Sequence, residues 1–167
     1  MVVTDNIFDF GDVDPIDIVE NLAEHYKWNF DRIAQDQITM LIEGGWRTYS
    51  LSLAWCEFDE TLKLICSFDI NPPEKKLSNL YEILNLANEK SWRGFFTFSS
   101  ENNIMIYRYS MNLNGGTEAS ANLIDRLVEN AITSCERFYP AFQLTCWGQE
   151  SPQKAMNVAF DEMYGTA

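Results

Sequence analysis

The segment from Tyr49 to Ile70 has the most regular pattern in the chain, because apolar and polar residues alternate on both sides of a short acidic turn. This alternation predicts two β-strands, each with one buried face. Asp59-Glu60 is the expected tip of the hairpin. A register that brings the apolar side chains onto one face pairs Tyr49 with Ile70, Leu51 with Phe68, Leu53 with Cys66 and Trp55 with Leu64. Other elements must cover that face.

The residues before this hairpin predict a helix and one further strand. Asp14-Pro15 indicates a helix start, because aspartate caps a helix N-terminus and proline fits the first helical position. A short extended piece follows at Trp28–Arg32, and Ile38–Glu43 alternates like a strand before the Gly44-Gly45 turn. Three main antiparallel strands result. The apolar stripe of the first helix is Ile16, Val19, Leu22, Ala23 and Tyr26.

The middle of the chain predicts a second helix and a second hairpin. Pro72-Pro73 ends the third strand, and apolar residues then recur at three and four positions in a helix from about Pro73 to Glu89. Gly94–Ser99 and Ile104–Leu113 form the hairpin, which turns at Glu101–Asn103. The sheet therefore has five main strands.

Two further helices complete the pattern. Gly115-Gly116 closes the sheet, and we expect Thr117 to cap a third helix. Pro140 is expected to kink or end this helix, so a separate helical piece should contain Phe142, Leu144 and Trp147 and end at Gly148. Ser151-Pro152 opens a last helix. The stripe of the third helix is Ile124, Leu127, Val128, Ala131 and Cys135.

The predicted order is α-β-β-β-α-β-β-α with an added C-terminal helix, which defines an α+β fold with a twisted antiparallel five-stranded sheet. The first and third helices are expected to cover the Tyr49–Ile70 face. Residues 1–13 are predicted as a flexible acidic arm and residues 14–148 as the α+β domain. Residues 149–167 are predicted as a C-terminal helix packed on the domain or extending from it.

Charge and cysteine content restrict the environment and the partners. Twelve Lys and Arg against 25 Asp and Glu give a net charge of −13, which opposes binding to nucleic acid. Neither a secretory signal nor an apolar run of membrane-spanning length is present, so we expect no membrane contact. The expected location is the cytoplasm with reduced thiols, and Cys56 and Cys66 are expected on opposite strand faces. The other cysteines are Cys135 and Cys146.

No pattern in the sequence indicates an enzyme, a cofactor or a metal site. The single histidine, His25, is expected at the surface of the first helix, and no cysteine has a spacing that places it beside His25. The acidic string Asp9–Asp14 lacks the ligand spacing of a calcium loop. We therefore predict no catalytic, cofactor-binding or metal-binding residue.

Aromatic residues provide the remaining candidates. Arg93–Phe98 approaches the aromatic strand of an RNA-recognition motif, but Phe96 occupies a position that needs Gly or Ala, so core and turn roles are expected. Trp46 and Trp92 lie beside turns, where a tryptophan can serve a protein interface. Trp55 is expected in the core.

The string Cys135–Gln143 (CERFYPAFQ), followed by Trp147-Gly148 and Ser151-Pro152, resembles the YbjN-domain proteins of bacteria. The resemblance covers about Pro15 to Met163. Leu86–Glu89, Trp92–Gly94, Ala54-Trp55 and Gly115-Gly116 match the same pattern. It implies a fold similar to type III secretion chaperones and a role in the regulation of sensory transduction, with no active-site residue to carry over.

Two functions fit these observations. The first is a non-enzymatic protein-interaction module, chaperone-like or regulatory, that forms a homodimer and binds an unidentified protein partner. The second is a small-molecule sensor with an aromatic-lined pocket between sheet and helices. For the first, the residues expected at the dimer or partner contact are Leu77, Leu80, Tyr81 and Leu84.

Overall fold

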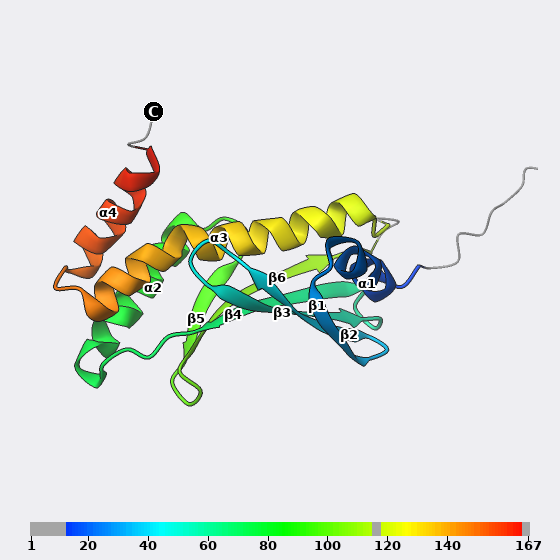
Figure 1. The fold of residues 1–167 in the computed structure, drawn as a ribbon, viewed down its shortest axis with the longest axis horizontal. Coiled ribbons are helices and arrows are strands. Elements are labelled where there is room, and N and C mark those ends of the chain that lie inside the picture. Colours follow the sequence, from blue (N-terminus) through cyan, green and yellow to red (C-terminus); the bar gives the residue numbers. More distant parts are fainter. Residues whose placement is uncertain (1–12, 115–117, 165–167) are drawn as a thin grey trace, which may run out of the picture.

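The computed structural model describes residues 13–114 and 118–164, and in these residues it shows an open six-stranded antiparallel sheet with four α-helices (Figure 1). The strand order is β1-β2-β3-β4-β6-β5. The elements are α1 (Pro15–Tyr26), β1 (Asn29–Ala34), β2 (Gln37–Glu43), β3 (Thr48–Cys56), β4 (Thr61–Asp69), a 3₁₀ turn (Glu74–Lys76), α2 (Leu77–Lys90), β5 (Phe95–Ser99), β6 (Ile104–Asn112), α3 (Ala121–Trp147) and α4 (Pro152–Tyr164).

The predicted α+β class and antiparallel sheet are confirmed. The long α3 runs along the sheet, with α1 near one end and α2 and α4 near the other (Figure 1). As predicted, α1 packs on β2 and β3, and α3 packs on β4 and β6. The face they cover carries fully buried Tyr49, Leu51, Leu53, Leu64 and Cys66. Of the segments predicted from the sequence, residues 1–12 of the acidic arm and the Gly115–Thr117 turn lie outside the described residues.

The register of the central hairpin differs from the prediction by two residues. Leu51 pairs with Cys66 and Leu53 with Leu64, because the turn spans Glu57 to Glu60 and is centred one residue before the predicted Asp59-Glu60 tip. Glu60 has a φ of 49°, and its carbonyl accepts a hydrogen bond from the Leu113 amide at 2.8 Å. A shift of two residues keeps each side chain on its predicted face, so the buried set is unchanged.

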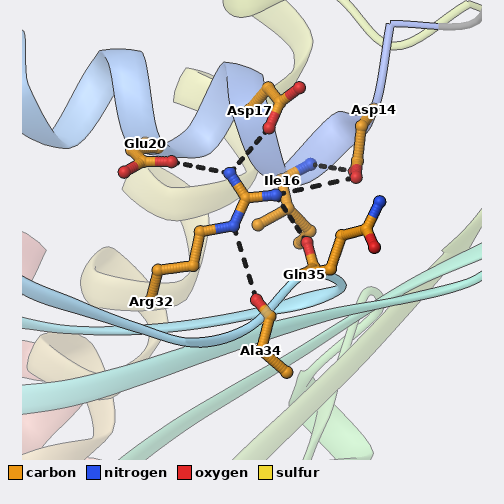
Figure 2. A network of polar contacts seen from close by, with 7 residues as sticks. All are labelled: Asp14, Ile16, Asp17, Glu20, Arg32, Ala34 and Gln35. Atoms are coloured by element: carbon orange, nitrogen blue, oxygen red, sulfur yellow. Dashed lines mark hydrogen bonds and ion pairs between the residues drawn. The ribbon is translucent and has the colours of Figure 1, made fainter.

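The prediction of five strands is wrong, because Asn29–Arg32 of the predicted extended piece belong to a complete edge strand, β1, which continues to Ala34. Arg32 lies opposite Ile38 on the face that α1 covers, where the alternation pattern calls for an apolar residue. Its guanidinium instead meets the acidic side of α1, with Nη1 at 2.6 Å from both Asp17 Oδ1 and Glu20 Oε2 (Figure 2). This ion network, together with Asp14 at 3.7 Å, balances the charge of the Arg32 guanidinium. Because an arginine occupies this inward position, apolar alternation alone does not predict the strand.

Helix α3 begins later and continues further than predicted. Ser120, not Thr117, is its N-cap, and the Ser120 hydroxyl accepts a hydrogen bond from the Leu123 amide at 3.1 Å. Pro140 does not end the helix, which continues to Trp147. An internal proline costs roughly 3 kcal/mol, but its neighbours Tyr139 and Ala141 are buried, as are residues 138 and 142, and this burial offsets the lost backbone hydrogen bond.

The C-terminal helix α4 packs against α2 and α3. Its residues Ala155, Met156 and Ala159 are buried. The Phe160 ring lies between two cations, with Arg137 Cζ 4.5 Å and Lys90 Nζ 5.0 Å from the ring centroid. These cation–π contacts join the three helices into one layer.

Glu136 fixes the β2–β3 turn to α3. Its carboxylate accepts hydrogen bonds from the amides of Gly45 and Trp46, at 2.9 and 3.2 Å, and from the Tyr49 hydroxyl at 2.5 Å. A Cβ at Gly44 would lie 2.6 Å from the Tyr49 ring, which explains why glycine is needed there. Burial and the bond to Glu136 raise the pKa of Tyr49, so its hydroxyl stays a donor.

Candidate ligand-binding cleft

A cleft of about 390 Å³ lies between strand β6 and helix α3, a volume within the usual range for small-molecule sites. Two arginines line it and none of its described lining residues carries a carboxylate, so we name it the basic cleft. The lining residues are Arg93, Tyr107, Tyr109, Met111, Leu123, Arg126, Leu127, Asn130 and Ala131.

The floor of the basic cleft comes from the inward face of β6. Tyr107, Tyr109 and Met111 alternate along this strand and point to the side of α3. Strand β5 is short, and its pairing with β6 begins at Phe95 opposite Arg108. Tyr109 and Met111 therefore lie on the part of β6 that has no β5 neighbour beside it. Burial raises the pKa of Tyr107, which keeps its hydroxyl protonated.

The wall opposite β6 is one face of α3. Leu123, Leu127 and Ala131 recur every four residues and supply its apolar part. Arg126 and Asn130, three residues after Leu123 and Leu127 respectively, lie beside this row and add polar groups at the rim. The cleft follows the N-terminal part of α3.

The turn from Ser91 to Gly94 supplies Arg93 and is held in place by hydrogen bonds. The Ser91 hydroxyl donates to the Gly94 carbonyl at 2.6 Å. The side chain of Asn88 bonds both backbone groups of Phe96, at 2.7 and 3.0 Å, which ties the end of α2 to the start of β5. Gly94 packs so closely on β6 that a Cβ there would lie 2.6 Å from the Arg108 carbonyl oxygen. The position of Arg93 is therefore set by the fold.

Arg93 and Arg126 differ from the other arginines of the chain. The sequence contains six, and in the described residues four of them contact a partner. No ion pair, hydrogen bond or aromatic ring engages Arg93 or Arg126 within residues 13–114 and 118–164, although the chain carries 25 carboxylates. The other four contact Asp17 and Glu20 (Arg32), the Asp69 carbonyl (Arg47), Thr97 (Arg108) and Phe160 (Arg137).

A second cleft, of about 320 Å³, lies on the other flank of α3, and we name it the acidic cleft because Asp125 and Glu129 line it. Tyr26 and Trp28 stack at its mouth with ring centroids 4.7 Å apart. Hydrogen bonding to Asp125 raises the pKa of the Tyr26 hydroxyl. Tyr26 was expected to face the core, but its side chain is 44% exposed. The remaining lining residues are Ile42, Val128, Ile132 and Thr133.

The four residues expected at a dimer or partner contact separate into two groups. Leu80 and Leu84 are buried in the core of the single chain. Tyr81 is half exposed and lies near Phe98, with ring centroids 6.4 Å apart, and Leu77 is partly buried. Within α2, Tyr81 and Leu77 remain accessible to a second molecule. The homodimer remains a prediction.

The single histidine and the aromatic candidates lie in different environments. His25 is at the surface, as expected, with its ring against Tyr26. Trp92 is 96% exposed and Trp46 is 54% exposed, whereas Phe96 is buried against Tyr107 and the aromatic residues of α3. Phe96 is therefore a core residue, as predicted.

Among the described residues, no group of three or more His, Cys, Asp or Glu side chains is placed to hold a metal ion. None of the helices in this part of the chain combines the length and apolar character that a membrane span requires. Buried Cys66 and Cys135 are free thiols whose sulfur atoms lie 3.5 Å apart, a contact that the sequence pattern did not indicate.

The fold and the cleft define an α+β domain with a ligand-sized site between its sheet and its longest helix. The family model for YbjN, described as "Putative bacterial sensory transduction regulator", matches residues 15–144, so the chain belongs to the YbjN family. The predicted resemblance is thereby confirmed, and the family description is that of a regulator rather than an enzyme.

A solved structure supports the same fold. It is described as the crystal structure of YbjN, a "putative transcription regulator" from E. coli, and it matches with a TM-score of 0.51 at 8% sequence identity. The match covers 90% of this chain and 93% of the E. coli chain. At this identity the match concerns the fold alone. A search of curated proteins finds no match.

Sequence reasoning missed both arginines of the basic cleft. Arg93 was considered only as part of an RNA-binding pattern, and Arg126 lies outside the apolar stripe of α3. A usable signal was present, because Arg126 and Asn130 form a polar row beside Leu123 and Leu127 in a strongly acidic chain. No sequence pattern indicated that this row faces the turn carrying Arg93.

Proposed function

We propose that this chain is a non-enzymatic regulatory domain that binds a small molecule in the basic cleft. Ligand binding then changes how the domain contacts a protein partner. One observation carries the proposal: the Ser91–Gly94 turn supplies Arg93 to the cleft and also carries Trp92, which is 96% exposed. A ligand that contacts Arg93 therefore acts on the same turn that a partner can reach. The proposal places the domain in the cytoplasm, in agreement with its acidic surface and its unpaired thiols.

Ligand binding can be tested by a thermal-shift screen of metabolites. A ligand that binds only the folded state adds about 2.7 kcal/mol to the free energy of unfolding at a hundredfold excess over Kd, and this raises the melting temperature. Leu123→Trp should fill the basic cleft and remove the response to any true ligand. Ile132→Trp is the matched control, because Ile132 is also a partly buried residue of α3 but lines the acidic cleft. A screen in which every hit stabilises the Leu123→Trp variant as strongly as the wild type would contradict the proposal.

Protein interaction has its own supporting observation, the pair of exposed aromatics at the start of β5. Phe95 is 50% exposed and lies three residues after Trp92, on the edge strand of the sheet. Exposed aromatic residues of this kind are enriched at interface hot spots. A pull-down from the native lysate should lose its specific partner with Trp92→Ala and keep it with Trp147→Ala, because Trp147 is an exposed tryptophan too, at 50%, but lies at the end of α3. Equal capture by both variants would exclude Trp92 as the contact.

A homodimer is proposed through the exposed part of α2, where Tyr81 and Leu77 lie. Light scattering at several concentrations measures this directly. A mass that stays at that of one chain over the whole range would exclude the dimer.

A further inference from the structure

We infer that the ligand of the basic cleft is an amphipathic organic anion, with a carboxylate or phosphate group held by Arg93 and Arg126 and an apolar body over the floor of β6. This inference rests on the proposed function and adds the chemical class of the ligand. It follows from the charges, from the shape of the cleft, and from how its arginines are held.

The charge argument begins with the acidity of the chain. With a net charge of −13, a cation at the surface has many carboxylates available to it. Arg32 is the one arginine of the described residues that pairs with carboxylates, three of which surround its guanidinium (Figure 2), while the other partnered arginines contact a carbonyl, a hydroxyl or an aromatic ring. Arg93 and Arg126 come from separate elements, line the same cleft, and have no such partner in the described residues. Two guanidinium groups in one cleft form a site for a planar or tetrahedral anion, which each can bind through two parallel hydrogen bonds.

The apolar argument concerns the rest of the lining. Met111, Leu123 and Leu127 offer hydrocarbon surface, and Tyr107 and Tyr109 offer aromatic faces. A small inorganic anion would leave this surface exposed to water. An organic anion covers it, at roughly 25 cal/mol for each Å² of apolar surface removed from water. The Asn130 amide at the rim adds one donor and one acceptor for a polar substituent.

The cleft is also held in shape before a ligand arrives. Asn88 and Ser91 fix the turn that carries Arg93, and Gly94 is in direct contact with Tyr107 and the β6 backbone. Arg126 lies on a helix whose next residue, Leu127, is buried. Only the two arginine side chains need to be ordered on binding, which limits the entropic cost.

The test uses two fluorescent probes that share one aromatic skeleton. 8-Anilinonaphthalene-1-sulfonate carries an anionic group, and N-phenyl-1-naphthylamine lacks it. For the full chain, we expect the Arg93→Gln/Arg126→Gln variant to raise the Kd of the sulfonate probe by roughly tenfold or more and to leave the Kd of the neutral probe within about twofold. Arg108→Gln is the matched control, because Arg108 lies on β6 but on the opposite face of the sheet, and this change should leave both values unaltered.

Competition then distinguishes the head groups. Phenylacetate and phenyl phosphate should both displace the sulfonate probe, and the one that acts at lower concentration identifies the preferred anion, while neutral 2-phenylethanol should need at least about a tenfold higher concentration than either. Melting curves of each variant establish that it is folded. If Leu123→Trp abolishes binding of both probes but the arginine changes have no effect, the anion inference is overturned and the cleft remains a ligand site. If Leu123→Trp also has no effect, the ligand site itself is overturned.

Discussion

The two flanks of α3 show how one helix can border two clefts of opposite charge. On one flank Arg126 and Asn130 line the basic cleft, and on the other Asp125 and Glu129 line the acidic cleft. Consecutive residues of a helix are about 100° apart, so Asp125 and Arg126 point to different sides. The row of buried residues between them separates the two clefts: Ile124, Leu127, Val128 and Ala131.

The clefts also differ in what surrounds their charged groups. The carboxylate of Asp125 has a polar neighbour in its own cleft, the Tyr26 hydroxyl, whose pKa it raises. Arg93 and Arg126 have no polar partner among the described residues. The comparison teaches that net charge is a poor guide to local chemistry, since the chain carries −13 and still forms a cleft free of described carboxylates. Within residues 13–114 and 118–164, the basic flank is the one without a counter-charge.

The largest effect is expected from Gly94→Ala, which disturbs the packing of the Ser91–Gly94 turn on β6 at one side of the basic cleft. A Cβ would lie 2.5 Å from the Tyr107 hydroxyl oxygen and 2.6 Å from the Arg108 carbonyl oxygen, and the latter is backbone that cannot move aside. We expect a loss of about 2 kcal/mol in the free energy of unfolding, or a fall in Tm of about 4 to 8 °C. Calorimetry measures both quantities.

Gly45→Ala serves as the comparison for this change. Its Cβ would lie 3.0 Å from a carboxylate oxygen of Glu136, a side-chain atom that can shift. We expect less than about 1 kcal/mol for this variant. A Gly94→Ala protein as stable as the Gly45→Ala protein would show that the turn is not tightly packed on β6, and the fixed position of Arg93 would lose its basis.

A smaller effect is expected from reversing one charge on each flank. Arg126→Glu places a carboxylate in the basic cleft and should raise the Kd of the sulfonate probe by about tenfold, which corresponds to about 1.4 kcal/mol. Asp125→Lys, at the adjacent position, changes the net charge by the same amount in the opposite sense. It should change this Kd by less than about twofold, because charges further apart than about 8 Å are screened at physiological salt. Fluorescence titration at fixed ionic strength measures both.

This pair of variants separates a local site from a general field effect. If Asp125→Lys strengthens binding as much as Arg126→Glu weakens it, the probe responds to the total charge of the protein. The basic cleft would then not be a specific anion site.

Period-two alternation was sufficient to predict the central part of the fold. Leu51, Leu53 and Leu64 were assigned correctly to the buried face, because a strand with one covered face must alternate. The two-residue error in pairing came from the turn, where Glu60 adopts a positive φ that glycine or asparagine usually takes. Side-chain alternation cannot detect such an error, because a two-residue shift keeps each side chain on the same face of the sheet.

The features that sequence patterns missed depend on contacts between distant segments. The sequence pattern did not predict β1 as a main strand because Arg32 occupies an inward position. A charge is stable at that position only because acidic residues of α1 pair with it. The sequence predicts a kink or an end of the helix at Pro140 because its local cost is real, whereas the burial of its neighbours is a tertiary effect. The basic cleft requires Arg93 and Arg126, 33 positions apart by their residue numbers, to meet across β6, and no local period encodes that meeting.

The smallest effect is expected on the acidic flank, in the titration of Tyr26. The nearby Asp125 carboxylate favours the protonated phenol as a donor and repels its anion, so both effects raise the pKa of Tyr26. Asp125→Asn removes the negative charge and should lower this pKa. In the folded state the raised pKa favours neutral Tyr26, so the associated stability is complete below the unfolded pKa and declines as pH rises through the folded value. The difference in tyrosinate absorbance between each protein and its Tyr26→Phe form isolates this group.

Arg126→Gln is the control from the basic flank. It removes a cation at the adjacent position of α3, and loss of a cation can only raise the pKa of a nearby tyrosine. If the two flanks are electrostatically separate, Arg126→Gln leaves the Tyr26 pKa unchanged while Asp125→Asn lowers it. A rise in the Tyr26 pKa with Arg126→Gln would show that the Arg126 charge reaches across the buried row of α3. In that event Arg126 would have a counter-charge in the acidic cleft, and the argument that it is free to hold an anion would fail.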